Sequence, residues 1–414
     1  MISKEKFYEK RNYNKSGGIT LIALVITIIV LLILAGVTIA ALSGDNGILK
    51  RAKEAKEKTQ QSQKEEEKTL SDMENMLGIY NFKNVNTNDT NPTETVPENS
   101  IVIEADANKG IVIKDKNDNE WVWVEVPKTT VFSGLTIDTT GTLTEQNYTD
   151  IKNKLVAYAA TYREGSSGQG FNWTDEWYDG CGMTSDEYTT AYQKMLKSVY
   201  TYGGFWIGRY EAGIDGSIED VSKARTSYSA ITIGTSPKAI SQKDAIPYNN
   251  VYCGEAQALV KEMTPDSSYT SSLMFGIQWD LVCKYLEVKS TLIIANINSD
   301  SGAWGNYQNV ERTITSDKAK KGGSWAVITG RKTINSSILL TTGASEDTNK
   351  MNIYDFAGNE WEWTLEKASK SDAPCAHRGA CCYDTAFNGP ASSRDDHGTT
   401  YNNYTIGFRS TLYK

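Results

Sequence analysis

The chain has 414 residues, a formal net charge of −8, ten Trp and 23 Tyr. This length is too great for one compact domain, and the composition excludes a collagen-like, fully disordered or multi-pass membrane protein. The acidic balance argues against a nucleic-acid partner, because a general nucleic-acid binder needs a basic surface to neutralise phosphates. All ten Trp lie beyond residue 120, so we expect the folded, aromatic-rich part of the protein to be C-terminal.

The first predicted element is a transmembrane helix over residues 19–42, which contain no charged side chain. As a helix this segment would be about 36 Å long, enough to cross the hydrocarbon core of a bilayer. Residues 1–18 form a polar leader with a net charge of +3. Basic residues before a span favour a cytoplasmic leader, so we expect a single-pass protein of the cell membrane with the rest of the chain outside the cell.

Small residues precede this apolar segment, whereas a secretory signal peptide has them after it. Gly17 and Gly18 are followed by ITLIALV, and this order resembles the type IV prepilin leader. In that family a peptidase cuts after a glycine and methylates the new N-terminus. The resemblance therefore implies processing between Gly18 and Ile19, a prepilin peptidase as partner, and pilin subunits as partners in a filament. Pilins usually have Glu five residues after the cut, where this chain has Ala23, and a plain uncut anchor is the alternative.

Residues 43–80 are predicted to form a charged helical stalk. Opposite charges one helical turn apart, such as Lys50 and Glu54, stabilise a solvated helix. Residues 84–100 are polar and lack aromatic side chains, so we expect a flexible linker over residues 81–100. A globular head over residues 101–414 follows.

The head is expected to be an α+β domain with many loops. Strands are predicted at residues 101–104, 110–114 and 120–126, and the last of these alternates apolar and polar side chains (EWVWVEV). Helices are predicted at residues 253–263 and 277–287. The rest of the head is expected to consist of strands joined by long connections rich in Gly, Ser and Asn.

Five motifs in the head are informative through their order. They are FWIGRYEAG, AIPYNNVYCGEAQAL, SLMFGIQWDLVCKYL, YDFAGNEWEWTLE and IGFRSTLY. This order resembles the formylglycine-generating-enzyme, or sulfatase-modifying-factor, superfamily, and it implies a C-type-lectin-like fold from about residue 120 to the end. Trp361 and Trp363 are predicted to pack as core, with Glu360 and Glu362 on the other side of the strand. No cofactor is expected, although the resemblance leaves room for calcium near Asn359.

Enzymatic activity is not expected. Oxidising members of the superfamily hold copper with two cysteines near the C-terminus, and others load iron with three histidines. This chain has Cys375, Cys381 and Cys382 without the family's spacing, and its only histidines are His377 and His397. A copper or iron oxidase acting on thiols is the alternative function, and a minor pilin or pseudopilin with a structural role is a third. The six cysteines are expected to be free thiols or to form one incidental disulfide.

Residues 376–406 contain no Lys, Glu, Gln, Met or Trp, although these five types make up 88 of the 414 residues. Random replacement of the adenines in Asn codons excludes those five types, because the third base stays a pyrimidine. Directly before a closing GFR, this tract resembles the variable region of proteins diversified by a diversity-generating retroelement. A polar loop that lacks the five types by chance is the alternative.

The resemblance implies a surface-anchored ligand-binding protein whose C-terminal tract varies to change specificity for a protein or glycan. Tyr, Asn, Ser and Gly suit such a surface because they supply aromatic contacts and adaptable hydrogen bonds. The positions predicted to vary and to bind ligand are Cys382, Tyr383, Phe387, Asn388, Gly389, Ser393, Asp395, Asp396, His397, Gly398, Tyr401, Asn402, Asn403 and Tyr404. The residues predicted to form the constant frame are Arg378, Gly379, Pro390, Ala391, Ser392, Arg394, Gly407, Phe408 and Arg409.

Overall fold

The protein is described by a computed structural model over residues 21–43, 48–76, 80–164 and 172–414. Its internal contacts divide the chain into two units, Met1–Asp72 and Met73–Lys414. The predicted leader and the predicted processing site at Gly18 and Ile19 lie outside the described residues.

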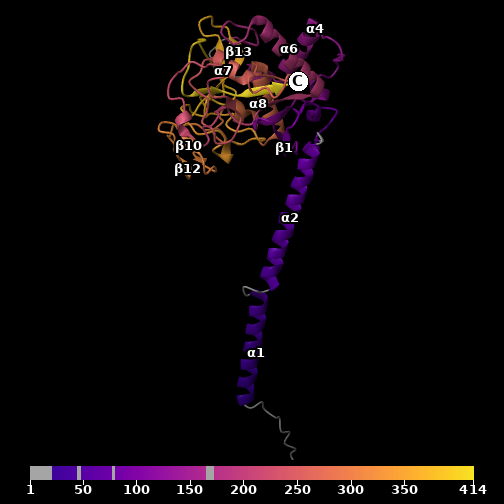
Figure 1. The fold of residues 1–414 in the computed structure, drawn as a ribbon, viewed down its shortest axis with the longest axis vertical. Helices are drawn as coiled ribbons and strands as arrows, with labels where there is room; N and C mark the ends of the chain where they lie inside the picture. The colour runs from indigo at the N-terminus through magenta and orange to yellow at the C-terminus, as the bar shows by residue number, and fades with distance from the viewer. Residues whose placement is uncertain (1–20, 44–47, 77–79, 165–171) are drawn as a thin grey trace, which may run out of the picture. The chain divides into compact units, whose positions relative to one another are not determined.

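The N-terminal unit contains helix α1 (Leu21–Ser43) and most of helix α2 (Ile48–Met76), both drawn in indigo to purple in Figure 1. Helix α2 coincides with the predicted charged stalk, and Lys53 and Glu57 approach to 3.9 Å on its exposed surface. Among the residues that the structure describes, no helix combines the length and the apolarity needed to cross a membrane. The predicted span over residues 19–42 is therefore unsupported.

The first sheet of the head has six antiparallel strands, and the last strand of the chain lies inside it. Strand β17 pairs with β5 on one side and with β8 on the other. In spatial order the strands are β1 (Ile101–Glu104), β2 (Val112–Lys114), β3 (Glu120–Glu125), β5 (Gly204–Gly208), β17 (Ser410–Tyr413) and β8 (Thr270–Leu273). The three strands predicted between residues 101 and 126 are confirmed, and the closing GFR is held immediately before an internal strand.

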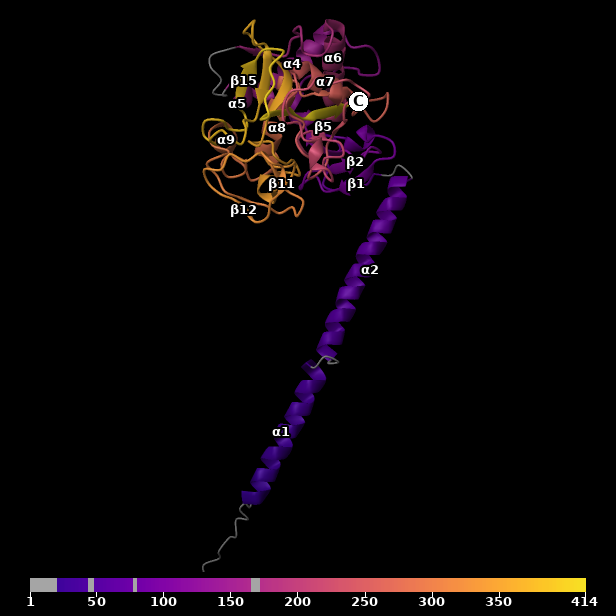
Figure 2. The ribbon, with the colours of Figure 1, turned by 60° about the vertical axis from the view of Figure 1, so that its left-hand side comes forward.

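The second sheet carries the tract 376–406 (Figure 2, yellow strands at β15). Strand β13 lies between β14, which is antiparallel to it, and β16, which is parallel. The strands are β15 (Arg394–His397), β14 (Cys375–Arg378), β13 (Trp361–Ala368) and β16 (Ile406–Phe408), and β4 (Trp173–Thr174) also pairs with β13. Residues 376–406 thus begin and end in regular strands.

Two predicted helices are confirmed as α7 (Cys253–Lys261) and α8 (Gly276–Lys289). The expectation that the remainder contains only strands and loops is wrong, because α4 (Glu145–Tyr158) and α6 (Ser185–Tyr202) are long helices. Each begins with a capping box, in which a threonine hydroxyl and the side chain three residues later satisfy each other's backbone N–H groups. The shorter helical segments are η1 (Pro92–Thr95), α3 (Lys128–Val131), α5 (Ala160–Glu164), η2 (Val221–Lys223), α9 (Ile294–Asn298) and η3 (Glu346–Thr348).

Short two-stranded ribbons complete the described part of the head. They are β6 (Gly213–Ile214) with β7 (Ala239–Ile240), β9 (Arg312–Thr313) with β12 (Arg331–Lys332), and β10 (Lys320–Lys321) with β11 (Ala326–Val327). One large hydrophobic core joins both sheets and includes the fully buried Trp121, Trp206, Trp279, Trp304 and Trp363. The head is therefore an α+β domain, as predicted.

The flexible linker predicted over residues 81–100 is wrong, because these residues pack on the head. The indole N–H of Trp123 donates to the hydroxyl of Thr90 at 2.8 Å, and that of Trp206 donates to the carbonyl of Thr95 at 2.9 Å. Both threonines are buried. The polar composition of residues 81–100 predicted a linker. In the structure the hydroxyls of Thr90 and Thr95 instead accept hydrogen bonds from buried indole N–H groups.

Candidate ligand-binding face

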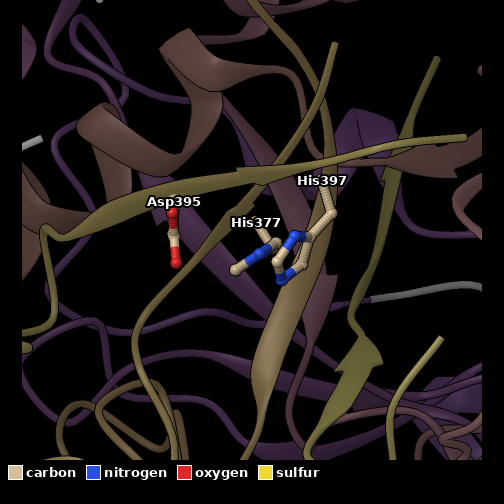
Figure 3. Close-up of side chains that lie close together, drawn as sticks. All are labelled: His377, Asp395 and His397. Carbon is tan, nitrogen blue, oxygen red and sulfur yellow. The ribbon is translucent and has the colours of Figure 1, made fainter. Parts of the chain in front are cut away.

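Strands β14 and β15 present two different surfaces. His377 lies opposite Asp395 in the ladder, and Arg378 lies opposite Arg394. Because side chains alternate along a strand, the two arginines share one side of the ladder while His377, Asp395 and His397 share the other. Figure 3 shows these last three side chains gathered together.

The arginine side of this ladder is a buried ion-pair network. Asp280 of α8 accepts from Arg378 at 2.9 Å and from Arg394 at 2.8 Å. Glu366 of β13 accepts from the same two guanidinium groups at 3.0 Å each. All four side chains have 0% exposure, and such charges are stable inside a protein only when they are paired and hydrogen-bonded.

A third arginine, Arg163 of α5, extends the network to Asp280, Glu366 and Asp175 at 2.9–3.1 Å. Burial alone would raise the pKa of Asp280, but Arg394, Arg378 and Arg163 outweigh it and hold that pKa below its ordinary value. Asp175 also accepts from the backbone N–H groups of Gly276 and Ile277 in the first turn of α8, a position that favours a carboxylate. The network therefore ties the tract to α5 and α8.

All nine residues predicted to form the constant frame are buried. Arg409 pairs with Glu362 at 2.7 Å and also donates to the carbonyls of Gly208 and Tyr354. A Cβ at Gly407 would lie 2.0 Å from a carboxylate oxygen of Glu360, so a larger residue there would have to displace that buried side chain. Glu360 and Glu362 do not face solvent, although sequence alternation placed them opposite the buried Trp363.

Ten of the fourteen residues predicted to vary reach the surface. Four of them are exposed, namely Tyr383, Phe387, Asn388 and Tyr404, and six are partly exposed, namely Asp395, His397, Gly398, Tyr401, Asn402 and Asn403.

The other four, Cys382, Gly389, Ser393 and Asp396, are buried, so the prediction that their side chains contact ligand is not met. Asp396 lies on the arginine side of β15, where Lys370 pairs with it at 3.3 Å. A Cβ at Gly389 would lie 2.6 Å from that of Ala380. The codon pattern predicts which positions can change by mutation, but it does not predict whether the side chain at each position is buried or exposed.

Two of the exposed tyrosines line a hollow of about 320 Å³. The rings of Tyr383 and Tyr404 meet edge to face, with centroids 5.8 Å apart. The hydrogen bond with Tyr383 and burial together raise the pKa of Tyr404 to about 12, so its phenol stays neutral at physiological pH. The other residues of the hollow are Arg225, Thr226, Asn249, Gly322, Gly323, Trp325 and Leu339.

These other residues lie outside the tract, and sequence reasoning did not identify them. Arg225 is held in place by donating to the carbonyls of Asn249 and Asn250, and Asn249 donates to the carbonyl of Tyr404 at 2.8 Å. Segments outside residues 376–406 therefore build one wall of the hollow, and Tyr383 and Tyr404 of the tract build the other. A guanidinium, an amide and three aromatic rings can bind a small polar or aromatic group through hydrogen bonds and stacking.

A larger hollow, of about 460 Å³, contains no residue of the tract and is lined by α6, α7 and β8. The side chain of Asn359 is fully used by protein, since it contacts Asn306, Leu340 and Glu211 at 2.6–3.2 Å. All six cysteines are buried free thiols. Among the described residues, His377, Asp395 and His397 form the one group with ligand atoms close enough to hold a metal ion.

Comparison with known proteins gives only remote similarity. No family model matches the chain, and no curated protein matches it. The chain is similar to the solved structure of Treponema denticola variable protein 1, with 12% identity and a TM-score of 0.30, over 51% of this chain and 85% of that one. It is similar to CarF with 14% identity and a TM-score of 0.31, over 51% of this chain and 86% of that one. Such similarity leaves the chain without an assigned family.

Proposed function

We propose that the head is a ligand-binding domain of C-type-lectin-like fold, and that a diversity-generating retroelement varies the face built by residues 376–406. The observation that carries this proposal is the separation of roles within one strand. In β15, Arg394 is fixed in the buried ion-pair network, while Asp395 and His397 project from the opposite side. A tract built in this way changes its outer side chains without changing the interactions that hold its backbone.

The exposed side chains suit binding. Tyr383, Phe387 and Tyr404 are 46%, 58% and 46% exposed, although large aromatic residues are usually buried. Exposed aromatic side chains are typical of interaction sites, because they gain contact area with little loss of conformational entropy. Two of the three, Tyr383 and Tyr404, line the hollow. The ligand is a protein or glycan that presents a small polar or aromatic group to the hollow.

The proposal is tested in the gene and its neighbourhood. We expect a reverse-transcriptase gene nearby and a near-copy of the last codons with Asn codons at the positions that vary. Sister copies of the gene should differ at exposed positions such as Phe387 and Tyr404 and should keep Arg378, Arg394 and Arg409. Scattered silent and conservative changes that spare none of the frame arginines would contradict the proposal.

The cellular location is a separate proposal, which the leader and the uncharged residues 19–42 support from sequence alone. We propose that the head is displayed outside the cell by a prepilin-like N-terminal segment. Cell fractionation of the full chain, and of a chain lacking residues 1–42, tests this proposal. Recovery of both proteins in the soluble fraction would contradict it, and a filament that incorporates the chain would favour the minor-pilin function.

A further inference from the structure

His377 is a buried base with no hydrogen-bond partner. Its side chain has 1% exposure, and neither Nδ1 nor Nε2 has a hydrogen-bond partner. The rings of Trp361 and Trp363 lie nearly perpendicular to it, with centroid distances of 4.7 and 5.2 Å, and surround it with apolar carbon. An orphaned buried polar group costs free energy and calls for an explanation such as an absent water or ion.

Two further donors converge on this imidazole. Asp395 is its direct partner across the β14–β15 ladder, and His397 follows two residues later on the same side of β15. The ring centroids of His377 and His397 are 5.0 Å apart. One ligand atom from each of the three residues lies within 4.8 Å of the other two, and Figure 3 shows His377 between Asp395 and His397.

We propose that His377, Asp395 and His397 bind a divalent transition-metal ion. Two imidazoles and one carboxylate suit Zn²⁺, Fe²⁺ or Co²⁺, whereas Ca²⁺ and Mg²⁺ prefer oxygen ligands throughout. The two tryptophans beside His377 provide the apolar surroundings that strengthen such a site. Three protein ligands leave at least one coordination position open, which water or a donor atom of a bound molecule can fill.

The geometry requires a modest closure on binding. Metal–ligand bonds of about 2.0–2.2 Å place the ligand atoms of a tetrahedral site roughly 3.4 Å apart. The ligand atoms now lie within 4.8 Å of one another, so each pair must approach by at most about 1.4 Å. The backbone of the two strands is fixed by their pairing, but His397 is the last residue of β15 and only partly buried. Rotation of the His397 side chain provides the movement. The imidazole would then give up its contact with the ring of Tyr401, whose centroid is 3.6 Å away, in return for a bond to the metal.

The metal alone tests this inference. Asp395 and His397 are among the positions that the proposed function lets vary, so the metal site is a property of this sequence and not of every copy of the gene. The full chain, purified without a histidine tag, contains no histidine other than His377 and His397. Equilibrium dialysis should show one equivalent of bound Zn²⁺, and Co²⁺ should give the visible absorption of a nitrogen- and oxygen-ligated ion. Asp395→Asn and His397→Gln should each weaken Zn²⁺ binding by at least about tenfold, because even partners outside the coordination sphere contribute 10–100-fold.

Asp396→Asn is the matched control, because Asp396 is the next residue but lies on the opposite side of β15 with Lys370. It should bind Zn²⁺ as the unchanged protein does. Thermal unfolding in the presence of a chelator shows whether each variant folds. Absence of a Zn²⁺ equivalent in the unchanged protein would overturn the inference, and so would equal binding by a folded Asp395→Asn and a folded His397→Gln.

Discussion

Arg394 and Asp280 are joined inside the head by two contacts, with Nη2 of the arginine 2.8 Å from Oδ1 and 3.0 Å from Oδ2 of the carboxylate. Neither side chain has any exposed surface. Arg394 belongs to residues 376–406 and Asp280 to helix α8, so this pair links that tract to the core of the head.

Removing this arginine should destabilise the protein strongly. Arg394→Gln leaves Asp280 and Glu366 short of a buried cation, and breaking a buried pair from one side costs about 3–5 kcal/mol. Urea unfolding of the full chain measures the change in the free energy of unfolding. Arg331→Gln is the control, because Arg331 pairs with Glu311 at the surface, where such pairs contribute about 0–1 kcal/mol. Equal losses in the two variants would show that the network does not support the tract.

Substitution of Gly389, a buried glycine inside the tract, should destabilise the protein far more than substitution of its exposed neighbours. Gly389→Ala would place a Cβ 2.6 Å from that of Ala380, and overpacking of this kind costs about 1–3 kcal/mol. Phe387→Ser, two residues earlier and on the surface, should change stability by about 0.5 kcal/mol or less.

The comparison is read from thermal unfolding, with Gly141→Ala as a control for the added methyl group, since nothing lies within 4 Å of that position. If Gly389→Ala were as stable as Phe387→Ser, the backbone around Ala380 would be able to yield. Gly389 would then be free to vary, as the codon argument alone predicts.

Much of this arrangement could be predicted from sequence, and the missing parts have physical causes. The composition of residues 376–406 indicated the tract, and its resemblance to a diversified variable region predicted Arg378, Arg394 and Arg409 as frame residues. Their partners were not identified, because Asp280 and Glu366 are brought to the arginines only by folding. Trp325 and Arg225 of the hollow were missed for the same reason.

The missed helices have a different cause. Helix α6 reads SDEYTTAYQKMLKSVYTY, and its Ser, Thr and Tyr have low intrinsic helix propensity. Its signal was the capping box of Thr184 and Glu187, followed by buried positions at helical spacing such as Tyr188, Ala191 and Met195. Tertiary packing of that face outweighs the weak propensity.

The segment before residue 101 should be necessary for the stability of the head. Thr90→Val keeps the shape of the side chain but removes the acceptor of the Trp123 indole and the donor to the carbonyl of Gly203. Leaving such buried groups unpaired costs about 1–3 kcal/mol. Thr149→Val, on the exposed surface of α4, is the matched control and should have little effect. A neutral Thr90→Val would restore the interpretation of residues 81–100 as a linker.

Glu360 should make stability depend on pH. Its carboxyl group is 1% exposed. Burial, with Glu362 and Asp355 nearby, outweighs a hydrogen bond from Asn249 and raises its pKa well above the ordinary value of 4.5. The folded protein therefore keeps a proton that the unfolded chain releases above pH 4.5. The stability that this group contributes is complete below that pH and is lost as the pH rises toward the folded pKa, by about 1.4 kcal/mol for each pH unit.

Glu360→Gln isolates this contribution, because glutamine has a similar shape and does not titrate. Other buried carboxyl groups, such as Glu211, act in the same direction in both proteins, so the useful quantity is the difference between the two free energies of unfolding. Urea unfolding from pH 4 to pH 7 should show that the free energy of unfolding of Glu360→Gln increases relative to that of the unchanged protein as the pH rises. A constant difference would mean that Glu360 ionises as readily in the folded head as in the unfolded chain, and that a partner such as a bound cation neutralises it there.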